Sequence, residues 1–159
     1  MKTLILGLGN PLITDDSVGL RVVEQLRPLL ADQPDVEVEE DYWGGLRLME
    51  RMIGYDRAIV VDAIQTGAPP GTIHLLFPEG IPTQRSASAH DVNFSTALEF
   101  GRQAGVQLPQ NHYIRLVGIE AEDILTFREH CTPAVQAAIP QAVETVLKAL
   151  DELLRGEPT

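Results

Sequence analysis

The sequence contains very little cysteine: one residue, Cys131, among 159. No intrachain disulfide and no cluster of thiolate ligands can therefore form, which suits a reducing compartment. Long apolar runs are also missing, because no stretch approaches the ~20 residues that a transmembrane helix needs. The apolar run after Met1 is too short for the core of a signal peptide, and no cleavage site follows it. We therefore expect a soluble, cytoplasmic protein.

Basic residues are scarce as well: 12 Lys and Arg stand against 23 Asp and Glu, for a net charge of −11. An acidic chain repels phosphate backbones, which disfavours nucleic acid as a partner and suits a basic or cationic partner better. The hydrophobic content of 44% and the charged content of 22% are typical of a globular protein. The length fits a single domain, residues 1–159, whose core needs no disulfide.

The hydrophobic pattern alternates strands with helices along the chain. Short apolar runs predict strands, and apolar residues at helical spacing predict helices. The predicted strands cover residues 3–8, 36–40, 58–64, 72–77 and 113–119. The predicted helices begin at Asp15 and Asp16, near Leu46, at Val92 and at Thr132. The fold class is therefore α/β: a three-layer sandwich with a mixed, mostly parallel twisted sheet and helices on both faces.

Two details of this fold follow from short-range signals. The loop between the strands at 58–64 and 72–77 is too short for a crossover helix, so these strands should be antiparallel neighbours. In the last helix, Thr132 should act as N-cap with Pro133 in the first turn, and Pro140 should kink or split the helix.

Gly7 and Gly9 follow the first predicted strand, as in a dinucleotide-binding turn. That fingerprint needs a third glycine at position 12, where this chain has Leu12, which is too large for a close approach. No Gly-Lys-Ser/Thr run is present either, so the sequence has no phosphate-binding P-loop. We interpret both glycines as turn residues and predict no nucleotide binding.

The segment from Gly7 to Gly19 reads Gly-Leu-Gly-Asn-Pro-Leu-Ile-Thr-Asp-Asp-Ser-Val-Gly. It resembles the signature of the nickel–iron hydrogenase maturation proteases, in which Gly-x-Gly-Asn-x-Leu leads through an acidic pair to a later glycine. Five further motifs agree in order and spacing: Asp62-Ala63, Pro70-Gly71-Thr72, Ser88-Ala89-His90, Leu116–Glu120 and Thr132–Val135. Each is weak alone, but together they make the chain similar to this family. The resemblance implies a phosphorylase/hydrolase-like α/β fold.

Two positions depart from the family pattern. Ser17 follows the acidic pair where glycine or alanine is usual, which is a small change. The second strand ends in Glu40-Asp41-Tyr42-Trp43 before two glycines, where the family commonly has Asp-Gly-Gly. Either Glu40 or Asp41 can therefore supply the family's carboxylate, and the bulky Tyr42 and Trp43 alter the shape of the substrate cleft.

The candidate site consists of Asp16, Asp62 and His90, as catalytic residues and as metal ligands. Asp16 ends a strand-to-helix turn, Asp62 lies near the carboxyl end of an apolar strand, and His90 lies on a loop before a helix. Sites in open α/β sheets gather beyond the carboxyl ends of strands, so these three can converge. Two carboxylates and an imidazole suit a divalent metal, with the assignment of His90 resting mainly on the resemblance.

Purely structural interpretations of these residues stay open at this point. Asp16 can serve only to cap its helix, and Asp62 can be hydrogen-bonded to the glycine turn. Three other histidines compete with His90, namely His74, His112 and His130.

The resemblance implies an endopeptidase that removes the C-terminal extension of a nickel–iron hydrogenase large-subunit precursor. The site would contact nickel that the precursor already holds, so the ion comes from the substrate and no tightly bound metal of the enzyme's own is expected. The implied partner is that precursor, with no nucleic acid, no membrane and a monomeric enzyme. The substrate-binding residues would be Gly9, Asn10, Glu40 and Asp41.

Other functions share part of this sequence pattern. A peptidyl-tRNA hydrolase-like esterase shares Gly-Leu-Gly-Asn-Pro, but its following His-Asn pair is Asp16-Ser17 here. A non-cleaving nickel-sensing chaperone would keep the same site residues. Cys131 at a helix start is a weaker candidate nucleophile, and neither Ser86 nor Ser88 lies in a nucleophile elbow.

Overall fold

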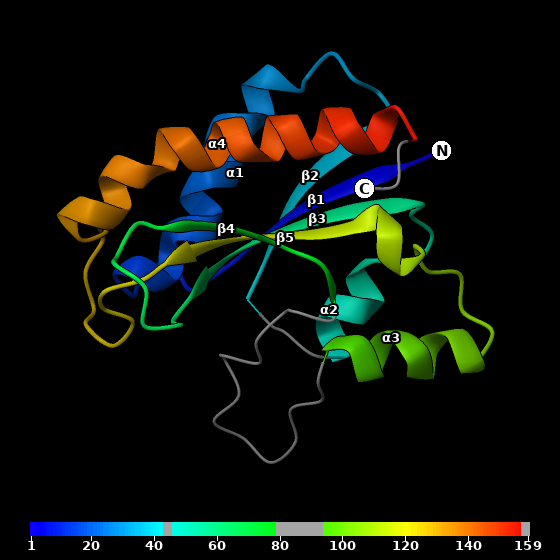
Figure 1. Ribbon diagram of the computed structural model, residues 1–159, viewed down its shortest axis with the longest axis horizontal. Coiled ribbons are helices and arrows are strands. Elements are labelled where there is room, and N and C mark those ends of the chain that lie inside the picture. Colours follow the sequence, from blue (N-terminus) through cyan, green and yellow to red (C-terminus); the bar gives the residue numbers. More distant parts are fainter. Residues whose placement is uncertain (43–45, 79–93, 157–159) are drawn as a thin grey trace.

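The computed structural model describes residues 1–42, 46–78 and 94–156. Strands and helices alternate along the chain, as the hydrophobic pattern predicted, except that the third and fourth strands follow each other directly (Figure 1). The strands are β1 (Thr3–Leu8), β2 (Val36–Asp41), β3 (Arg57–Ile64), β4 (Ile73–Leu76) and β5 (Ile114–Glu120). The helices are α1 (Val18–Leu29), α2 (Leu46–Arg51), α3 (Phe94–Gln103) and α4 (Pro133–Leu154). Two short 3-10 turns, η1 (Asp15–Ser17) and η3 (Asn111–Tyr113), precede α1 and β5.

One five-stranded sheet joins the strands in the order β2-β1-β3-β5-β4. β1, β2, β3 and β5 run parallel, and β4 is antiparallel to β5. Figure 1 shows α1 and α4 covering one face of the sheet and α2 and α3 lying against the other. The predicted three-layer α/β architecture with a mixed, mostly parallel sheet is therefore confirmed.

The central strand β3 is apolar because both of its faces are covered. Ile59 and Val61 pack into the core under α1 and α4, whereas Ala58 and Val60 pack into the core under α2 and α3. Successive side chains of a strand point to opposite faces, so a strand covered on both sides is a nearly continuous apolar run. Burying each of these larger side chains contributes about 2 kcal/mol, which holds β3 in the middle of the sheet.

The predicted pairing of β3 with β4 is wrong, because β5 lies between them. The relative direction was correct, since β4 does run against the parallel strands. β5 is buried along its whole length and β4 is partly exposed, so β5 gains more from an interior position. The loop over residues 65–72 crosses the end of β5 instead. There, Gly71 N–H donates to the carbonyl of Glu120, and Ala121 N–H donates to the carbonyl of Ile64, both at 2.8 Å.

The last helix begins where predicted and does not split. Thr132 is its N-cap residue and Pro133 is in its first turn, but the Thr132 side chain makes no capping hydrogen bond. α4 continues through Pro140 as one helix. Pro140 has no N–H to donate to the carbonyl of Gln136, one turn earlier. Both residues are exposed, so water can bind that carbonyl instead. Within the described residues, no helix combines the length and the apolar character needed to cross a bilayer.

Candidate functional site

The candidate site lies beyond the carboxyl ends of β1 and β3. The chain passes from β1 to β2 on one side and later to β3 on the other side of β1. Such a switch in strand order opens a crevice beyond the carboxyl ends of the strands. Asn10 and Asp16 follow β1, and the parallel register places Gly7 beside Val61, one residue before Asp62. The structure thus brings Asp16 and Asp62 to the same edge of the sheet, with η1 packed against β3.

Glycines allow the start of α1 to approach these strand ends closely. A Cβ atom on Gly9 would lie 2.2 Å from the carbonyl oxygen of Asp16. A Cβ atom on Gly19 would lie 2.4 Å from the carbonyl oxygen of Val61 and 2.5 Å from that of Leu8. No side chain fits at either position, so backbone packing alone accounts for these glycines and no nucleotide is needed to explain them.

The half-buried side chain of Asp16 is held by the turn that follows β1. Its Oδ2 accepts a hydrogen bond from Asn10 N–H at 3.0 Å, and Asn10 Oδ1 in turn accepts one from Leu12 N–H at 3.0 Å. The N-cap residue of α1 is Ser17, not Asp16. The hydrogen bond from Asn10 fixes the direction of the Asp16 carboxylate at the crevice, which agrees with a site residue better than with a helix cap.

Asp62 lies on the face of the sheet that α2 and α3 cover. It alternates with Val60 and Ile64, which both pack into the core on that face. Asp62 is only partly buried, whereas its neighbours in β3 are fully buried. On the adjacent strand β5 its register partner is Gly118, which has no side chain, and Ile64 fills the space next to that glycine. Asp62 is therefore a partly exposed residue at the edge of an otherwise apolar layer.

His90, the third predicted site residue, lies outside the described residues, as do Ser86 and Ser88. Among residues 1–42, 46–78 and 94–156, no group of three or more His, Cys, Asp or Glu side chains has the arrangement of a metal site. The described part of the chain therefore contributes two carboxylates to the predicted ligand set, Asp16 and Asp62.

One of the competing histidines is hydrogen-bonded to an acid at the end of β5. His74 Nε2 lies 3.1 Å from an oxygen of Glu120, which also accepts hydrogen bonds from the backbone and hydroxyl of Thr66 at 2.7 and 2.5 Å. Burial raises the pKa of Glu120, but the hydrogen bonds from Thr66 and His74 outweigh burial and hold that pKa below its usual value. His112, in η3, and His130, on the loop before α4, are both exposed. Glu120 was not predicted as a site residue, although it shares the signal that marked Asp62, a carboxylate in an apolar strand.

The two acids at the end of β2 point to opposite faces of the sheet. Asp41 is buried and lies 3.2 Å from Arg47 and 3.5 Å from Arg51, both on α2. Glu40 is exposed and lies 3.4 Å from Arg27 on α1. Asp41 is therefore on the same face as Asp62, while Glu40 is not.

Asp15, next to Asp16, is a fully buried structural residue. Its Oδ2 accepts the backbone N–H groups of Glu122 and Asp123, both at 2.9 Å. The backbone N–H of Thr132 donates to Oδ1 at 2.7 Å, and the Thr132 hydroxyl donates to Oδ2 at 2.8 Å. The hydroxyl expected to cap α4 thus binds Asp15 instead. Asp15 ties the loop after β5 and the start of α4 to the loop after β1.

Cys131 is buried beside this network. Its Sγ lies 3.8 Å from Ser17 Oγ and 3.6 Å from the carbonyl oxygen of Thr14. Burial raises the pKa of the Cys131 thiol, which is the opposite of what a thiolate nucleophile needs. The structure therefore agrees with the interpretation of Cys131 as a packed core residue.

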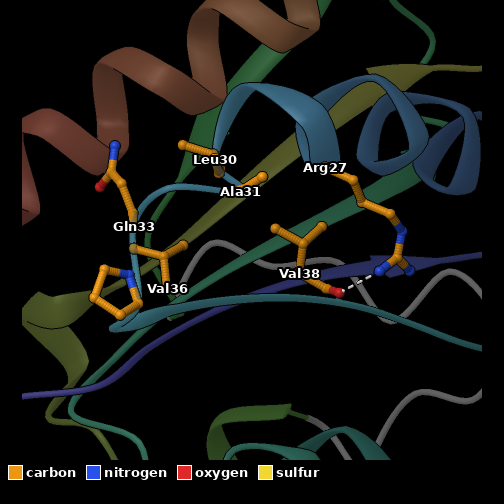
Figure 2. Close-up of a pocket in the computed structure, with 7 residues that line it drawn as sticks. Arg27, Leu30, Ala31, Gln33, Val36 and Val38 are labelled. Carbon is orange, nitrogen blue, oxygen red and sulfur yellow. Dashed lines mark hydrogen bonds between the residues drawn. The ribbon is translucent and has the colours of Figure 1, made fainter.

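A cavity of about 350 Å³ lies at the other end of β2, between this strand and the end of α1. Figure 2 shows Arg27 at its rim, where the guanidinium donates to the carbonyl of Val38 at 2.7 Å. The lining residues are Arg27, Leu30, Ala31, Gln33, Pro34, Val36 and Val38. None of the predicted site residues lines this cavity, so it is separate from the candidate site.

Comparisons with known proteins agree with this arrangement. A family model described as hydrogenase maturation protease, HycI, matches residues 20–149. The chain is 35% identical to the hydrogenase 2 maturation protease of Escherichia coli, over 96% of this chain and 92% of the relative. It is 30% identical to the hydrogenase expression/formation protein HupD of Rhizobium leguminosarum, over 94% and 74% of the two chains. Among solved structures, the hydrogenase maturating endopeptidase HybD from Escherichia coli is similar with a TM-score of 0.76 at 33% identity, over 96% and 93%.

Proposed function

Because this chain belongs to the hydrogenase maturation protease family, we propose that it removes the C-terminal extension from the large-subunit precursor of a nickel–iron hydrogenase. The observation that supports this best is the position of Asp16 and Asp62 at the switch point between β1 and β3. A peptide that lies across the carboxyl ends of these strands meets both carboxylates.

Asp16, Asp62 and His90 contact nickel that the precursor already carries. Carboxylates and imidazole are donors that divalent first-row metals accept, and three protein ligands leave positions for the ligands of the precursor. The hydrogen bond from Asn10 N–H orients the Asp16 carboxylate before the substrate arrives. Since the ion belongs to the substrate, cutting is coupled to prior insertion of the metal.

Hydrolysis of the peptide bond needs a base for the attacking water and a group that polarises the carbonyl. Asp16 or Asp62 takes the proton of the water. The substrate's nickel supplies the polarisation, as a bound divalent metal does in other hydrolases. This division of roles uses the side chains at the switch point and no covalent enzyme intermediate.

The substrate chain is held by Gly9, Asn10 and Asp41. Of the two acids that the sequence left open, Asp41 fits better, because it shares a face with Asp62 and is oriented by two arginines of α2. Glu40 points to α1 on the opposite face, where it pairs with Arg27. A net charge of −11 also favours a protein over nucleic acid as the partner, and one monomer provides the whole crevice.

The test compares nickel-loaded and nickel-free large-subunit precursor, each incubated with the protein and weighed by mass spectrometry. We expect loss of a C-terminal peptide from the nickel-loaded precursor only. An unchanged mass in both samples, with binding retained, would contradict the protease and favour a non-cleaving chaperone. Cleavage of both samples at equal rates would contradict the role of nickel while leaving the protease.

A further inference from the structure

Large apolar side chains are exposed on two loops beside the candidate site. Leu12, on the loop after β1, is 60% exposed. Leu125 and Phe127, on the loop between β5 and α4, are 83% and 77% exposed. We call the surface formed by Leu12, Ile13, Leu125 and Phe127 the apolar tip. Contiguous exposed apolar groups of this kind mark interaction sites more often than isolated ones do.

The two loops of the apolar tip are joined to each other by backbone contacts. Ile13 and Phe127 form an antiparallel bridge. On either side of it, Thr14 N–H donates to the carbonyl of Thr126 at 3.1 Å, and Arg128 N–H donates to the carbonyl of Leu12 at 3.0 Å. In Figure 1 the loop before α4 extends beyond the sheet at the end where α1 begins.

Side-chain hydrogen bonds hold the base of the apolar tip. Asp123 Oδ1 accepts from the N–H groups of Leu125 and Thr126 at 2.9 and 3.0 Å. The buried Asp15 accepts the N–H of Asp123 at 2.9 Å and donates its own N–H to the carbonyl of Asp123 at 3.0 Å. Both loops are therefore ordered before any partner binds, which reduces the entropy lost on association.

The apolar tip is continuous with the candidate site. Two hydrogen bonds lead from one to the other: Asp16 binds Asn10 N–H, and Asn10 Oδ1 binds Leu12 N–H. Leu12 is therefore linked to Asp16 through a single residue, Asn10. Exposed apolar groups at this place cost free energy unless a partner covers them.

We propose that the apolar tip docks apolar residues of the precursor protein next to the peptide bond that is cut. This inference rests on the proposed function and names the contact that positions the substrate there. The tip offers on the order of 400 Å² of apolar surface, whereas a stable dimer buries roughly 800 Å² per partner. It therefore suits a supplementary contact to a substrate held elsewhere in the crevice, and not a dimer of this chain. An anionic membrane is disfavoured by the net charge of −11.

The test replaces Leu125 and Phe127 together by serine and measures both the affinity for nickel-loaded precursor and the kinetics of its cleavage. Loss of two anchoring contacts should weaken binding and raise KM by about tenfold or more, with kcat unchanged within about twofold. Both side chains are exposed, so the melting temperature should stay the same. The matched control is Phe100→Ser on α3, where a phenylalanine is 62% exposed away from both loops.

The outcomes separate this inference from the proposed function. Weaker binding of the precursor by the double variant, but not by Phe100→Ser, supports docking on the apolar tip. This holds whether or not the wild-type protein cuts the precursor. If the double variant and the wild type have equal affinity and equal KM for the precursor, the docking role of the apolar tip is overturned, while the proposed cleavage is not. Two further results also overturn it: a wild-type dimer in sedimentation that the double variant loses, or wild-type binding to phosphatidylcholine vesicles that the double variant loses, in either case with precursor affinity unchanged.

Discussion

At the carboxyl ends of the strands, the two faces of the sheet differ in what they hold. On the face of α1 and α4, the one buried carboxylate described there, Asp15, is saturated by hydrogen bonds from the loop after β5 and from Thr132. On the face of α2 and α3, three strands carry an acid at or near their carboxyl ends: Asp41 on β2, Asp62 on β3 and Glu120 on β5. Asp41 is buried between Arg47 and Arg51, and Glu120 is buried and hydrogen-bonded to Thr66 and His74, so Asp62 is the partly exposed acid among these three.

This difference has a physical cause. A carboxylate that is buried permanently must have its lone pairs satisfied by the protein, and Asp15 meets that requirement with four donor contacts. A carboxylate that works on a substrate must keep part of its surface accessible, as Asp16 and Asp62 do. The neighbouring acids Asp15 and Asp16 thus differ in burial and in hydrogen-bond partners, and the role proposed for Asp16 needs the accessible one of the two.

The largest expected effect comes from removing the accessible charges. In Asp16→Asn and Asp62→Asn, cleavage of nickel-loaded precursor should fall by about 10³-fold, because the base and the metal contacts are lost. The melting temperature should change little, since both side chains are only partly buried. The measurement is the cleavage rate by mass spectrometry beside a thermal melt. Wild-type cleavage rates in both variants would contradict the assignment of Asp16 and Asp62 as site residues.

Removing the scaffold carboxylate should have the largest effect on stability. Asp15→Ala leaves four donor groups without their acceptor and should lower the free energy of unfolding by about 3 kcal/mol. The matched control is Glu144→Ala, an exposed acid on α4, which should change stability by less than about 0.5 kcal/mol. Urea unfolding at neutral pH measures both. A stable Asp15→Ala variant would show that the loop after β5 does not depend on this residue.

The adjacent acids Asp41 and Glu40 of β2 allow the two faces of the sheet to be compared within one strand. Asp41→Asn weakens the contacts with Arg47 and Arg51 and should raise KM for the precursor by about tenfold. Glu40→Gln removes only an exposed pair with Arg27 and should leave KM within about twofold. Steady-state cleavage kinetics distinguish the two variants. A larger rise in KM for Glu40→Gln than for Asp41→Asn would indicate that the substrate binds on the face of α1.

The smallest expected effect is a pH dependence of stability at the end of β5. The folded-state pKa of Glu120 lies below its unfolded value of about 4.5, so its ionised form stabilises the fold above that pH. This contribution should be lost as the pH falls through the folded-state pKa. The stability difference between wild type and Glu120→Gln should therefore shrink below about pH 4.5, when both are unfolded in urea across a pH series. Glu144→Gln controls for the loss of one negative charge, and a difference that stays constant would contradict the assignment.

Most of the secondary structure was predictable because it depends on local periodicity. The strands at 3–8 and 58–64 and the start of α4 at Thr132–Pro133 all agree with the structure. The position of β4 was not predictable in the same way, because strand order depends on which strand gains most from burial on both faces. Loop length indicated the direction of β4 but not its neighbour.

The candidate site was predictable in part. Carboxylates at the ends of β1 and β3 were found from the sequence, and the strand order places them at one switch point. Glu120 was missed as a site candidate although the same reasoning applies to it. The assignment of His90 stays a prediction, since it lies outside the described residues.

The sequence by itself determined the alternation of strands and helices, the acidic residues at the strand ends and the family motifs that contain them. Only the tertiary structure decided which groups each member of an acidic pair contacts. Asp15 binds Thr132, which is 117 residues away, and Asp16 binds the turn beside it. Asp41 faces α2 and Glu40 faces α1, because successive side chains of a strand point to opposite faces. Local patterns show that an acid is present, but the folded chain decides whether its partner is six residues away, as for Asp16, or 117 residues away, as for Asp15.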